Sequence, residues 1–249
     1  FNADNVLDEK YISKMNDAFI ARNKKDVITS FRNSKNFGSN LISVMYGLYF
    51  VYGCRLECRG RTVAGCSTRV TGTGYLINSN IVKDGCWNYV TLTEDWEFTA
   101  DQILKNNKIV FCDEAVFYDE QPTTFSIMWK QRVRWAKGHL LVYITRFKDL
   151  IKSLFKSKNK NGGKNKFSIF DISINIMPLC VISTSITILQ FICVLIAPLF
   201  GISIQEAYIP YLINAGKNIV TAYIGLVFIF SLLYIIEHKR IKNVSLGKK

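Results

Sequence analysis

Histidine and proline are scarce in this sequence, and acidic residues are well outnumbered. The 249 residues include 2 histidines and 4 prolines, and 19 acidic residues stand against 32 Lys and Arg, for a formal net charge of +13. With so few imidazoles, a zinc site on Cys54 and Cys58 would lack ligands. The seven cysteines include no Cys-x-x-Cys pair, which argues against a disulfide framework and indicates a reducing compartment.

The basic charge is combined with an apolar composition, since hydrophobic residues make up 49% of the chain. A basic soluble protein suggests a nucleic-acid partner, but here the positive charge clusters beside long apolar runs. This argues against nucleic acid and favours a membrane protein that faces an anionic leaflet.

Two apolar runs predict membrane-spanning helices. No charged residue occurs in 172–205, and a second run covers 218–236. About 20 residues suffice to span a bilayer as a helix. Seven lysines lie within 148–166 and five basic residues within 239–249, whereas the connection between the runs carries only Glu206 and Lys217. The positive-inside rule therefore predicts that both ends face the cytoplasm.

The segment before the first run has apolar residues at helical spacing through 140–155 and a basic opposite face. This pattern predicts a helix in the membrane interface, although an ordinary amphipathic helix of a folded domain has the same pattern. The Lys-, Asn- and Gly-rich stretch 156–166 is typical of a flexible linker.

Residues 1–139 are of another kind. Short apolar runs such as 27–31 and 108–112 alternate with amphipathic stretches such as 8–22 and 94–107. This alternation predicts an α/β domain. The aromatic-rich run 40–56 could line a binding site or touch the membrane, but a run of that length favours an internal helix.

A dense acidic cluster interrupts this domain in the stretch TLTEDWEFTA, residues 91–100, which holds Glu94, Asp95 and Glu97. Taken alone, the cluster is typical of a solvated helix start, because acidic side chains suit a helix N-terminus. Its neighbours along the chain give it a second interpretation.

Three short motifs follow one another: NADN at 2–5, expected at a strand end before a helix, LTED at 92–95, and QRVRW at 131–135. In this order, and next to apolar spans, they resemble the membrane-bound family 2 glycosyltransferases, the group of cellulose, chitin, hyaluronan and poly-N-acetylglucosamine synthases. The strings GTGYLI at 72–77 and DEQPTTF at 119–125 also look like this family.

The resemblance implies a partial GT-A-type, Rossmann-like nucleotide-sugar domain over residues 1–139. An interface helix and basic linker would follow over 140–170, and two transmembrane helices over 171–249. It also implies a site for Mg²⁺ or Mn²⁺, because the family holds a divalent cation with Asp-x-Asp. Asp4 matches the second Asp of that motif, while Asn2 stands at the first and offers a neutral oxygen with one negative charge fewer.

By the same resemblance, Asp95 is the general base that takes the proton of the acceptor hydroxyl, and Glu94 orients or hydrogen-bonds. Glu97 is expected to be a bystander. Gln131 would hydrogen-bond near the nucleotide or acceptor, and Arg134 would neutralise the diphosphate.

Trp135 would stack on an acceptor sugar, and Arg132 is expected to face away toward lipid phosphate. Gly72 and Gly74 would let the backbone approach the acceptor, although a plain turn is an equal alternative.

The implied function is an inverting glycosyltransferase at the cytoplasmic membrane face. Its donor would be a nucleotide-diphosphate sugar, expected to be UDP-linked, and its acceptor a growing polysaccharide or a lipid-linked carbohydrate. The alternative is a non-catalytic fragment or partner subunit, because the chain starts at NADN without the earlier strands of the family. Two spans are few for a channel, so a missing N-terminal segment or an oligomer would have to supply the rest.

Overall fold

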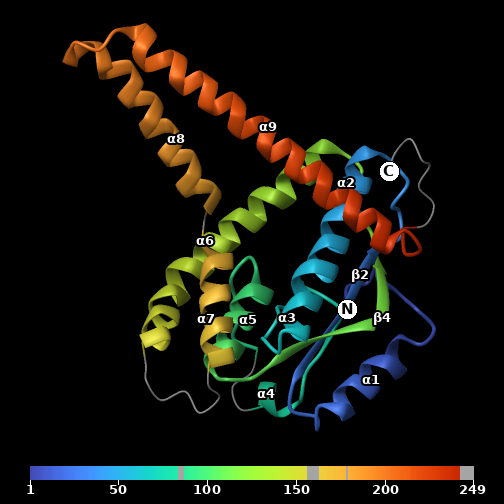
Figure 1. The fold of residues 1–249 in the computed structure, drawn as a ribbon. Coiled ribbons are helices and arrows are strands. Elements are labelled where there is room, and N and C mark those ends of the chain that lie inside the picture. Colours follow the sequence, from blue (N-terminus) through green and yellow to red (C-terminus); the bar gives the residue numbers. More distant parts are fainter. Residues whose placement is uncertain (84–86, 156–162, 178, 242–249) are drawn as a thin grey trace. The chain divides into compact units, whose positions relative to one another are not determined.

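The computed structural model describes residues 1–83, 87–155, 163–177 and 179–241. The chain divides into two compact units, one of residues 1–177 with 239–249 and one of residues 178–238. The strands of the first unit are β1 (Val6–Leu7), β2 (Val27–Ser34), β3 (Tyr75–Leu76) and β4 (Ile109–Asp119). Its helices are α1 (Tyr11–Ala21), α2 (Leu41–Tyr52), the π-helix η1 (Gly53–Cys58), α3 (Arg59–Val63), α4 (Asn80–Lys83), α5 (Glu94–Leu104), α6 (Phe125–Phe155) and α7 (Gly163–Ile176) (Figure 1).

The sheet of the first unit has the strand order β1-β4-β2-β3, with β2 and β4 parallel and the outer strands antiparallel to them. Seven of the eight residues of β2 are buried, as expected for a parallel strand covered on both faces. Alternate side chains face α1 on one side, as Ile28 and Val110 do, and α5 on the other, as Val27 and Ile109 do. The α/β class and both central strands predicted from the sequence are therefore confirmed.

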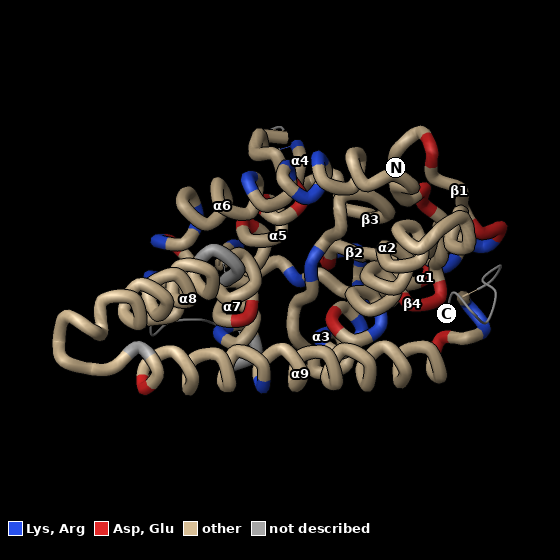
Figure 2. Tube along the Cα trace, turned by 90° about the horizontal axis from the view of Figure 1, so that it is seen from above, with Lys and Arg blue, Asp and Glu red and all other residues tan. Residues whose placement is uncertain are grey.

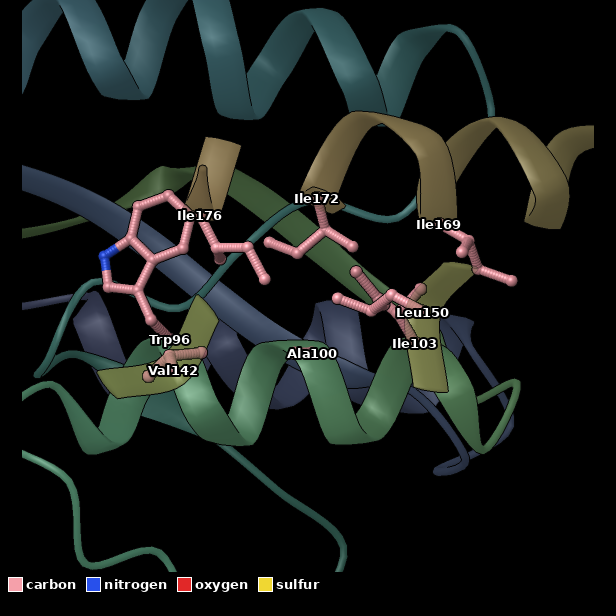
Figure 3. Close-up of a cluster of buried hydrophobic side chains, with 8 residues drawn as sticks. All are labelled: Trp96, Ala100, Ile103, Val142, Leu150, Ile169, Ile172 and Ile176. Atoms are coloured by element: carbon pink, nitrogen blue, oxygen red, sulfur yellow. The ribbon is translucent and has the colours of Figure 1, made fainter. Parts of the chain in front are cut away.

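A second core lies among α5, α6 and α7, away from the sheet. Its buried members are Trp96, Ala100, Ile103, Val142, Leu150, Ile169, Ile172 and Ile176 (Figure 3). The helix α5 thus has one face on the sheet and another on α6 and α7. This double packing holds the N-terminus of α5, where the acidic cluster begins.

Helix α6 contains both the QRVRW motif and the expected interface helix. It runs unbroken from Phe125 to Phe155, so the expected boundary at residue 140 falls inside one helix. Val142 and Leu150 are buried against α5 and α7, whereas Leu141 and Ile144 are exposed. The buried side chains show that α6 packs as an amphipathic helix of the folded domain. Contact with the membrane interface stays a prediction for the exposed apolar side chains only.

The first apolar run is divided between the two units. Its first residues, with the preceding 163–171, form α7, where Ile172 and Ile176 are buried and Asp171 accepts a hydrogen bond of 2.6 Å from Arg61. The unit boundary therefore lies after residue 177, seven residues beyond the expected one, because tertiary packing covers α7. Of the expected linker, 156–162 lie outside the described residues and 163–166 are helical.

The second unit consists of α8 (Leu179–Ile196), the short 3₁₀ turn η2 (Ala197–Phe200) and α9 (Ile204–Glu237). Two helices long and apolar enough to cross a membrane cover Ile182–Phe200 and Gln205–Glu237, with mean hydropathies of 2.1 and 2.5. Both helices are almost bare of charge in Figure 2.

Helix α9 begins earlier than the apolar run 218–236 predicts. Ser203 caps it, accepting from the backbone N–H of Glu206 and donating to its carboxylate, so Glu206 and Lys217 lie within the helix. Its 34 residues extend about 51 Å at 1.5 Å per residue, which is more than the ~30 Å hydrocarbon core of a bilayer. The connection between α8 and α9 is therefore only the turn η2 and the residues after it.

Candidate active site

A cavity of about 240 Å³ opens in the first unit beside the N-terminus of α5. Its walls come from the N-terminal turn, β2, α2 with η1, the loop before β3, and α6. The lining residues are Asn2, Arg32, Tyr49, Phe50, Gly53, Cys54, Arg69, Thr71, Gly72, Thr73, Leu92, Thr93, Glu94, Asp95, Trp96, Gln131, Arg134, Trp135 and His139. Three motifs that are far apart in sequence thus contribute to one cavity.

The acidic cluster occupies the first turn of α5, which follows Thr93. Burial raises the pKa of the Asp95 carboxyl to about 6, and the charge of Glu94 adds to the rise. Backbone N–H groups at the helix start and the guanidinium of Arg69 oppose it. A carboxyl with this pKa is ionised at neutral pH but retains affinity for a proton, which is the property that a general base needs.

Gly72 lies next to that carboxylate. It has a φ of +77°, and a Cβ placed on it would lie 3.7 Å from Oδ2 of Asp95. Gly74 has another role, because it is absent from the lining and its Cβ would lie 2.3 Å from the ring of Phe117. Of the two predicted glycines, Gly72 lies at the cavity, whereas Gly74 permits close packing inside the domain.

Helix α6 presents Gln131, Arg134, Trp135 and His139 to the cavity. Arg134 donates to the backbone carbonyl of Leu92 at 3.4 Å, so α6 contacts the loop that leads into α5. The buried Oε1 of Gln131 has no hydrogen-bond partner among the described residues. A polar atom left in that state is available to a ligand.

Trp135 lies among aromatic side chains of α2. Its ring centroid is 6.1 Å from that of Tyr46 and 6.3 Å from that of Phe50. Arg132 is absent from the cavity lining, in line with the expectation that it faces away, but it has partners within the protein besides any lipid phosphate. Its Nε donates to the hydroxyl of Tyr46 at 3.1 Å, and its guanidinium lies over the rings of Tyr46, Tyr49 and Trp135, because this aromatic wall offers cation–π contacts.

The run 40–56 accordingly satisfies both of its interpretations in part. Tyr46 and Val51 are buried inside the domain, while Tyr49 and Phe50 line the cavity.

Glu97 is not a bystander charge. It is buried, accepts from Arg146 at 3.0 Å and thereby links α5 to α6.

The N-terminal motif forms a turn before β1 and does not end a strand. The backbone N–H of Asn5 donates to the carbonyl of Asn2 at 3.1 Å. Asn2 lines the cavity, whereas Asp4 is exposed, is absent from the lining, and receives Lys35 Nζ on its backbone carbonyl at 3.1 Å. The two predicted metal ligands therefore sit on one turn, with only Asn2 at the cavity.

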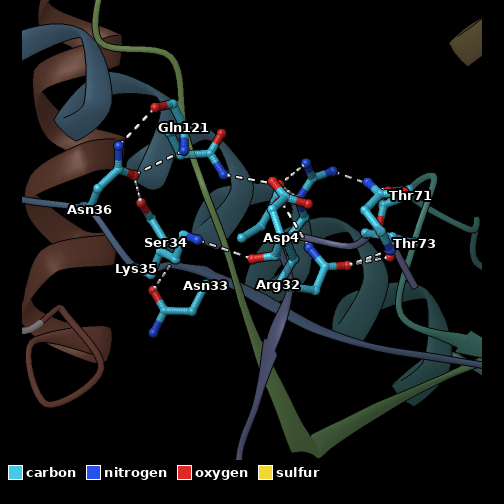
Figure 4. A network of polar contacts seen from close by, with 12 residues as sticks. Asp4, Arg32, Asn33, Ser34, Lys35, Asn36, Thr71, Thr73 and Gln121 are labelled. Atoms are coloured by element: carbon cyan, nitrogen blue, oxygen red, sulfur yellow. Dashed lines mark hydrogen bonds and ion pairs between the residues drawn. The ribbon is translucent and has the colours of Figure 1, made fainter.

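A polar network anchors this turn (Figure 4). The side chain of Asn5 donates to Asp119 at 2.9 Å and accepts from Thr73 at 2.6 Å. Asp119 also accepts from Nε of Arg32 at 2.9 Å and from Gln121 at 3.2 Å. Because this carboxylate is saturated with donors, it fixes the turn to the ends of β2 and β4.

The sequence interpretation missed three charged or titratable lining residues, Arg32, Arg69 and His139. His139 follows Gln131 and Trp135 at intervals of four, so helical spacing could have revealed it. Its ring centroid lies 4.5 Å from that of Trp96, and burial lowers its pKa to about 4, with a further contribution from Arg69. Arg69 has no such spacing signal, because it lies in a loop.

The comparison with protein families now decides the relationship. The model of glycosyl transferase family group 2 matches residues 2–236, which include every lining residue of the cavity. The chain belongs to glycosyl transferase family group 2. The resemblance seen in the sequence motifs is thereby confirmed.

Individual relatives of this family 2 chain match over shorter stretches. The probable glycosyltransferase YdaM of Bacillus subtilis is 32% identical over 92 residues, covering 36% of this chain and 21% of the relative. The poly-β-1,6-N-acetyl-D-glucosamine synthase of Staphylococcus epidermidis is 28% identical over 156 residues, covering 61% and 37%. That of Staphylococcus aureus (strain COL) is 28% identical over 140 residues, covering 55% and 33%. The chain thus spans between about a fifth and two fifths of the length of these relatives.

The cysteines and acidic residues of this family 2 chain form no preassembled metal centre within the described ranges. No group of three or more His, Cys, Asp or Glu side chains is placed there to hold an ion. Cys54 and Cys58 are buried free thiols of η1.

Proposed function

We propose that this family 2 chain catalyses inverting transfer of a sugar from a nucleotide-diphosphate sugar, UDP-linked by the resemblance, to a carbohydrate acceptor. The observation that carries the proposal is the cavity itself, where a carboxyl with a pKa near 6 lies with Gln131, Arg134 and Trp135. This transfer needs a positioned base, a positively charged side chain such as the guanidinium of Arg134, and an aromatic ring.

The reaction assigns one step to each group. Asp95 accepts the proton of the acceptor hydroxyl while the hydroxyl oxygen forms a bond to the anomeric carbon. The bond from that carbon to the diphosphate oxygen breaks, and its electron pair stays on the leaving diphosphate. The guanidinium of Arg134 stabilises this developing charge. Attack opposite the leaving group inverts the anomeric carbon.

The acceptor occupies the aromatic wall in this proposal. Trp135 offers a flat apolar surface that matches the C–H face of a sugar ring, and Tyr49 and Phe50 extend it. The carbonyl oxygen of Gln131, which has no partner in the described part of the chain, can accept from a sugar hydroxyl. A growing polysaccharide and a lipid-linked carbohydrate both present such a ring, so both acceptor classes belong to the proposal.

A divalent cation, Mg²⁺ or Mn²⁺, fits this site only with ligands from the donor. Asn2, which lines the cavity, would hold it through its side-chain oxygen, whereas Asp4 offers a carboxylate on the same turn but outside the lining. Two residues of one turn cannot fill six coordination positions, so the diphosphate or water would complete the shell. When bound, the cation would supply positive charge to the leaving diphosphate.

The second unit supports a location at the membrane. Its two apolar helices are long enough to span, and the lysine-rich segment before them argues for a cytoplasmic catalytic unit in contact with membrane lipids. The proposed enzyme therefore uses a cytoplasmic donor at the membrane face. A preceding segment or an oligomer would be needed for polymer export.

The test uses the complete open reading frame, expressed in membranes. A panel of radiolabelled nucleotide sugars is supplied with Mg²⁺ or Mn²⁺, and label is followed into polymer and into lipid extract. We expect transfer from one nucleotide sugar, with an anomeric configuration opposite to that of the donor. Absence of transfer from every donor would favour the non-catalytic alternative, and retained configuration would exclude the direct displacement.

A further inference from the structure

Arg69 is a buried cation in the wall of the proposed active site, outside the three motifs. Its side chain is 12% exposed and lines the same cavity as Trp96 and Asp95. Burial of a guanidinium is costly unless other groups hold and compensate it. The contacts of Arg69 therefore indicate its role.

Several contacts fix the side chain of Arg69 in the cavity wall. Its Nη2 donates to Oε2 of Glu57 at 2.6 Å, and its guanidinium lies over the ring of Trp96 at 4.8 Å. Glu57 belongs to the π-helix η1, a type of irregularity that is frequent at functional sites. Gly53 of η1 leaves room, because a Cβ there would lie 3.3 Å from Nη2.

The backbone on both sides of Arg69 is also pinned. The N–H of Thr68 donates to the carbonyl of Ile109 in β4 at 2.9 Å, and the N–H of Val70 donates to Oγ1 of Thr99 in α5 at 3.2 Å. Nε of Arg69 itself has no hydrogen-bond partner among the described residues. Arg69 is thus fixed through Nη2 and through the backbone of its two neighbours.

We propose that Arg69 is a positioning residue of the transfer reaction, which holds a fixed positive charge beside Asp95 and keeps that carboxylate able to accept a proton. The proposal rests on the proposed function, since Asp95 is the base only in a glycosyl transfer. It has a physical basis of its own, because a buried carboxylate next to Glu94 needs a nearby cation to stay ionised.

Other charged and titratable groups near Asp95 would not replace Arg69. These groups are Glu94 on α5, Arg32 on β2, Tyr75 on β3, and Arg134 and His139 on α6. Glu94 raises the pKa of Asp95, and His139 is neutral above a pH of about 4. Burial raises the pKa of Tyr75, so its phenol stays neutral. Arg32 is already committed to Asp119, and Arg134 contacts the carbonyl of Leu92.

The test measures the ionisation of Asp95 without requiring turnover. The complete protein in membranes is treated with a carbodiimide, which reacts with protonated carboxyls, and modification of Asp95 is quantified by mass spectrometry from pH 4.5 to 9. We expect a midpoint near pH 6 for the unsubstituted protein and a rise of about one pH unit or more in Arg69→Met. Arg69→Gln serves as a second neutral variant if the first does not fold.

Two controls separate charge from structure. Arg69→Lys keeps the charge, so its midpoint should stay within about half a unit of the original, well below the effect of a lost neighbouring charge. Arg59→Met removes a partly exposed guanidinium that binds Asp113 outside the cavity, and it should leave the midpoint unchanged. An unmoved midpoint in the neutral Arg69 variants, or an equal shift in Arg59→Met, would overturn the proposal.

Transfer assays then separate this inference from the proposed function. Where transfer occurs, the acidic limb of the kcat/KM profile should move upward with the labelling midpoint. If the midpoint moves but no nucleotide sugar supports transfer, the proposed function fails while the placement of Arg69 stands. If Arg69→Met weakens only nucleoside diphosphate binding at an unchanged midpoint, Arg69 is a donor ligand and the inference is wrong.

Discussion

Replacing Asp95 by Asn should abolish transfer and at the same time stabilise the protein. The substitution keeps the size of the side chain and removes its charge. In the folded protein the carboxyl of Asp95 is partly buried beside Glu94, and its pKa is raised to about 6 from an ordinary value of 3.8. The two effects have one cause, because burial makes the group a better base and a costlier anion.

The loss of activity can be bounded. A positioned general base contributes about 10²–10⁴-fold, so Asp95→Asn should lower kcat by at least about a hundredfold while nucleotide binding is retained. In the unsubstituted enzyme the base must be deprotonated. Its kcat/KM should therefore fall about tenfold per unit as the pH drops below about 6.

The gain in stability follows from the sign of the pKa shift. Because the folded state binds this proton more tightly than the unfolded chain does, the contribution of Asp95 to stability is fully present below about pH 4. It is lost as the pH rises through about 6. A shift of this size corresponds to about 3 kcal/mol, so Asp95→Asn should be more stable by up to that amount at pH 7.5 and equally stable at pH 4.

The assay combines transfer by membranes, nucleotide binding and thermal unfolding of the purified protein at both pH values. Asp101→Asn is the matched control, because Asp101 lies on the same helix, accepts from Tyr89 at 2.5 Å and does not line the cavity. The control should keep transfer and should gain no stability. If Asp95→Asn retains turnover within about tenfold, or loses stability at pH 7.5, the assignment of Asp95 as a buried base is refuted.

Three further outcomes are expected. Trp135→Ala should reduce transfer to the acceptor more than hydrolysis of the donor, because water needs no stacking surface; equal losses would mean that Trp135 only packs. Asn2→Asp should lower the Mn²⁺ or Mg²⁺ concentration for half-maximal rate, since it adds a carboxylate ligand; identical metal titrations would place Asn2 outside the coordination shell. Gly138→Ala should cost about 1–3 kcal/mol in unfolding experiments and slow transfer, because its Cβ would lie 2.5 Å from Thr93. Gly60→Ala, with open space around it, is the control and should be neutral or slightly stabilising.

Much of the candidate site could be read from local patterns. The acids of residues 94–97 indicated a helix start, and the spacing of Gln131, Arg134 and Trp135 indicated one helix face. Both are properties of neighbouring residues, and both agree with α5 and α6. The resemblance of the motifs to family 2 then brought the two helices together on one site.

The roles of other residues depended on partners far away in sequence. Glu97 forms an ion pair between α5 and α6 with Arg146, which lies 49 residues further along the chain. Arg132 packs against aromatic side chains of α2. Gly74 and Gly72 are two residues apart, but only Gly72 lies at the cavity. Spacing alone could not separate them.

The apolar helices also combine features that the local sequence predicts with features that depend on distant contacts. Composition alone was sufficient to predict two helices that could span a membrane, because bilayer thickness and helix rise set the required length. Where each helix begins depended on packing and capping. The residues before 178 are held in the first unit by the core around Ile172, and Ser203 starts α9 fourteen residues before the apolar run. Hydrophobic periodicity indicates which side chains are kept from water. Whether protein or lipid surrounds them depends on contacts between segments that are distant in sequence.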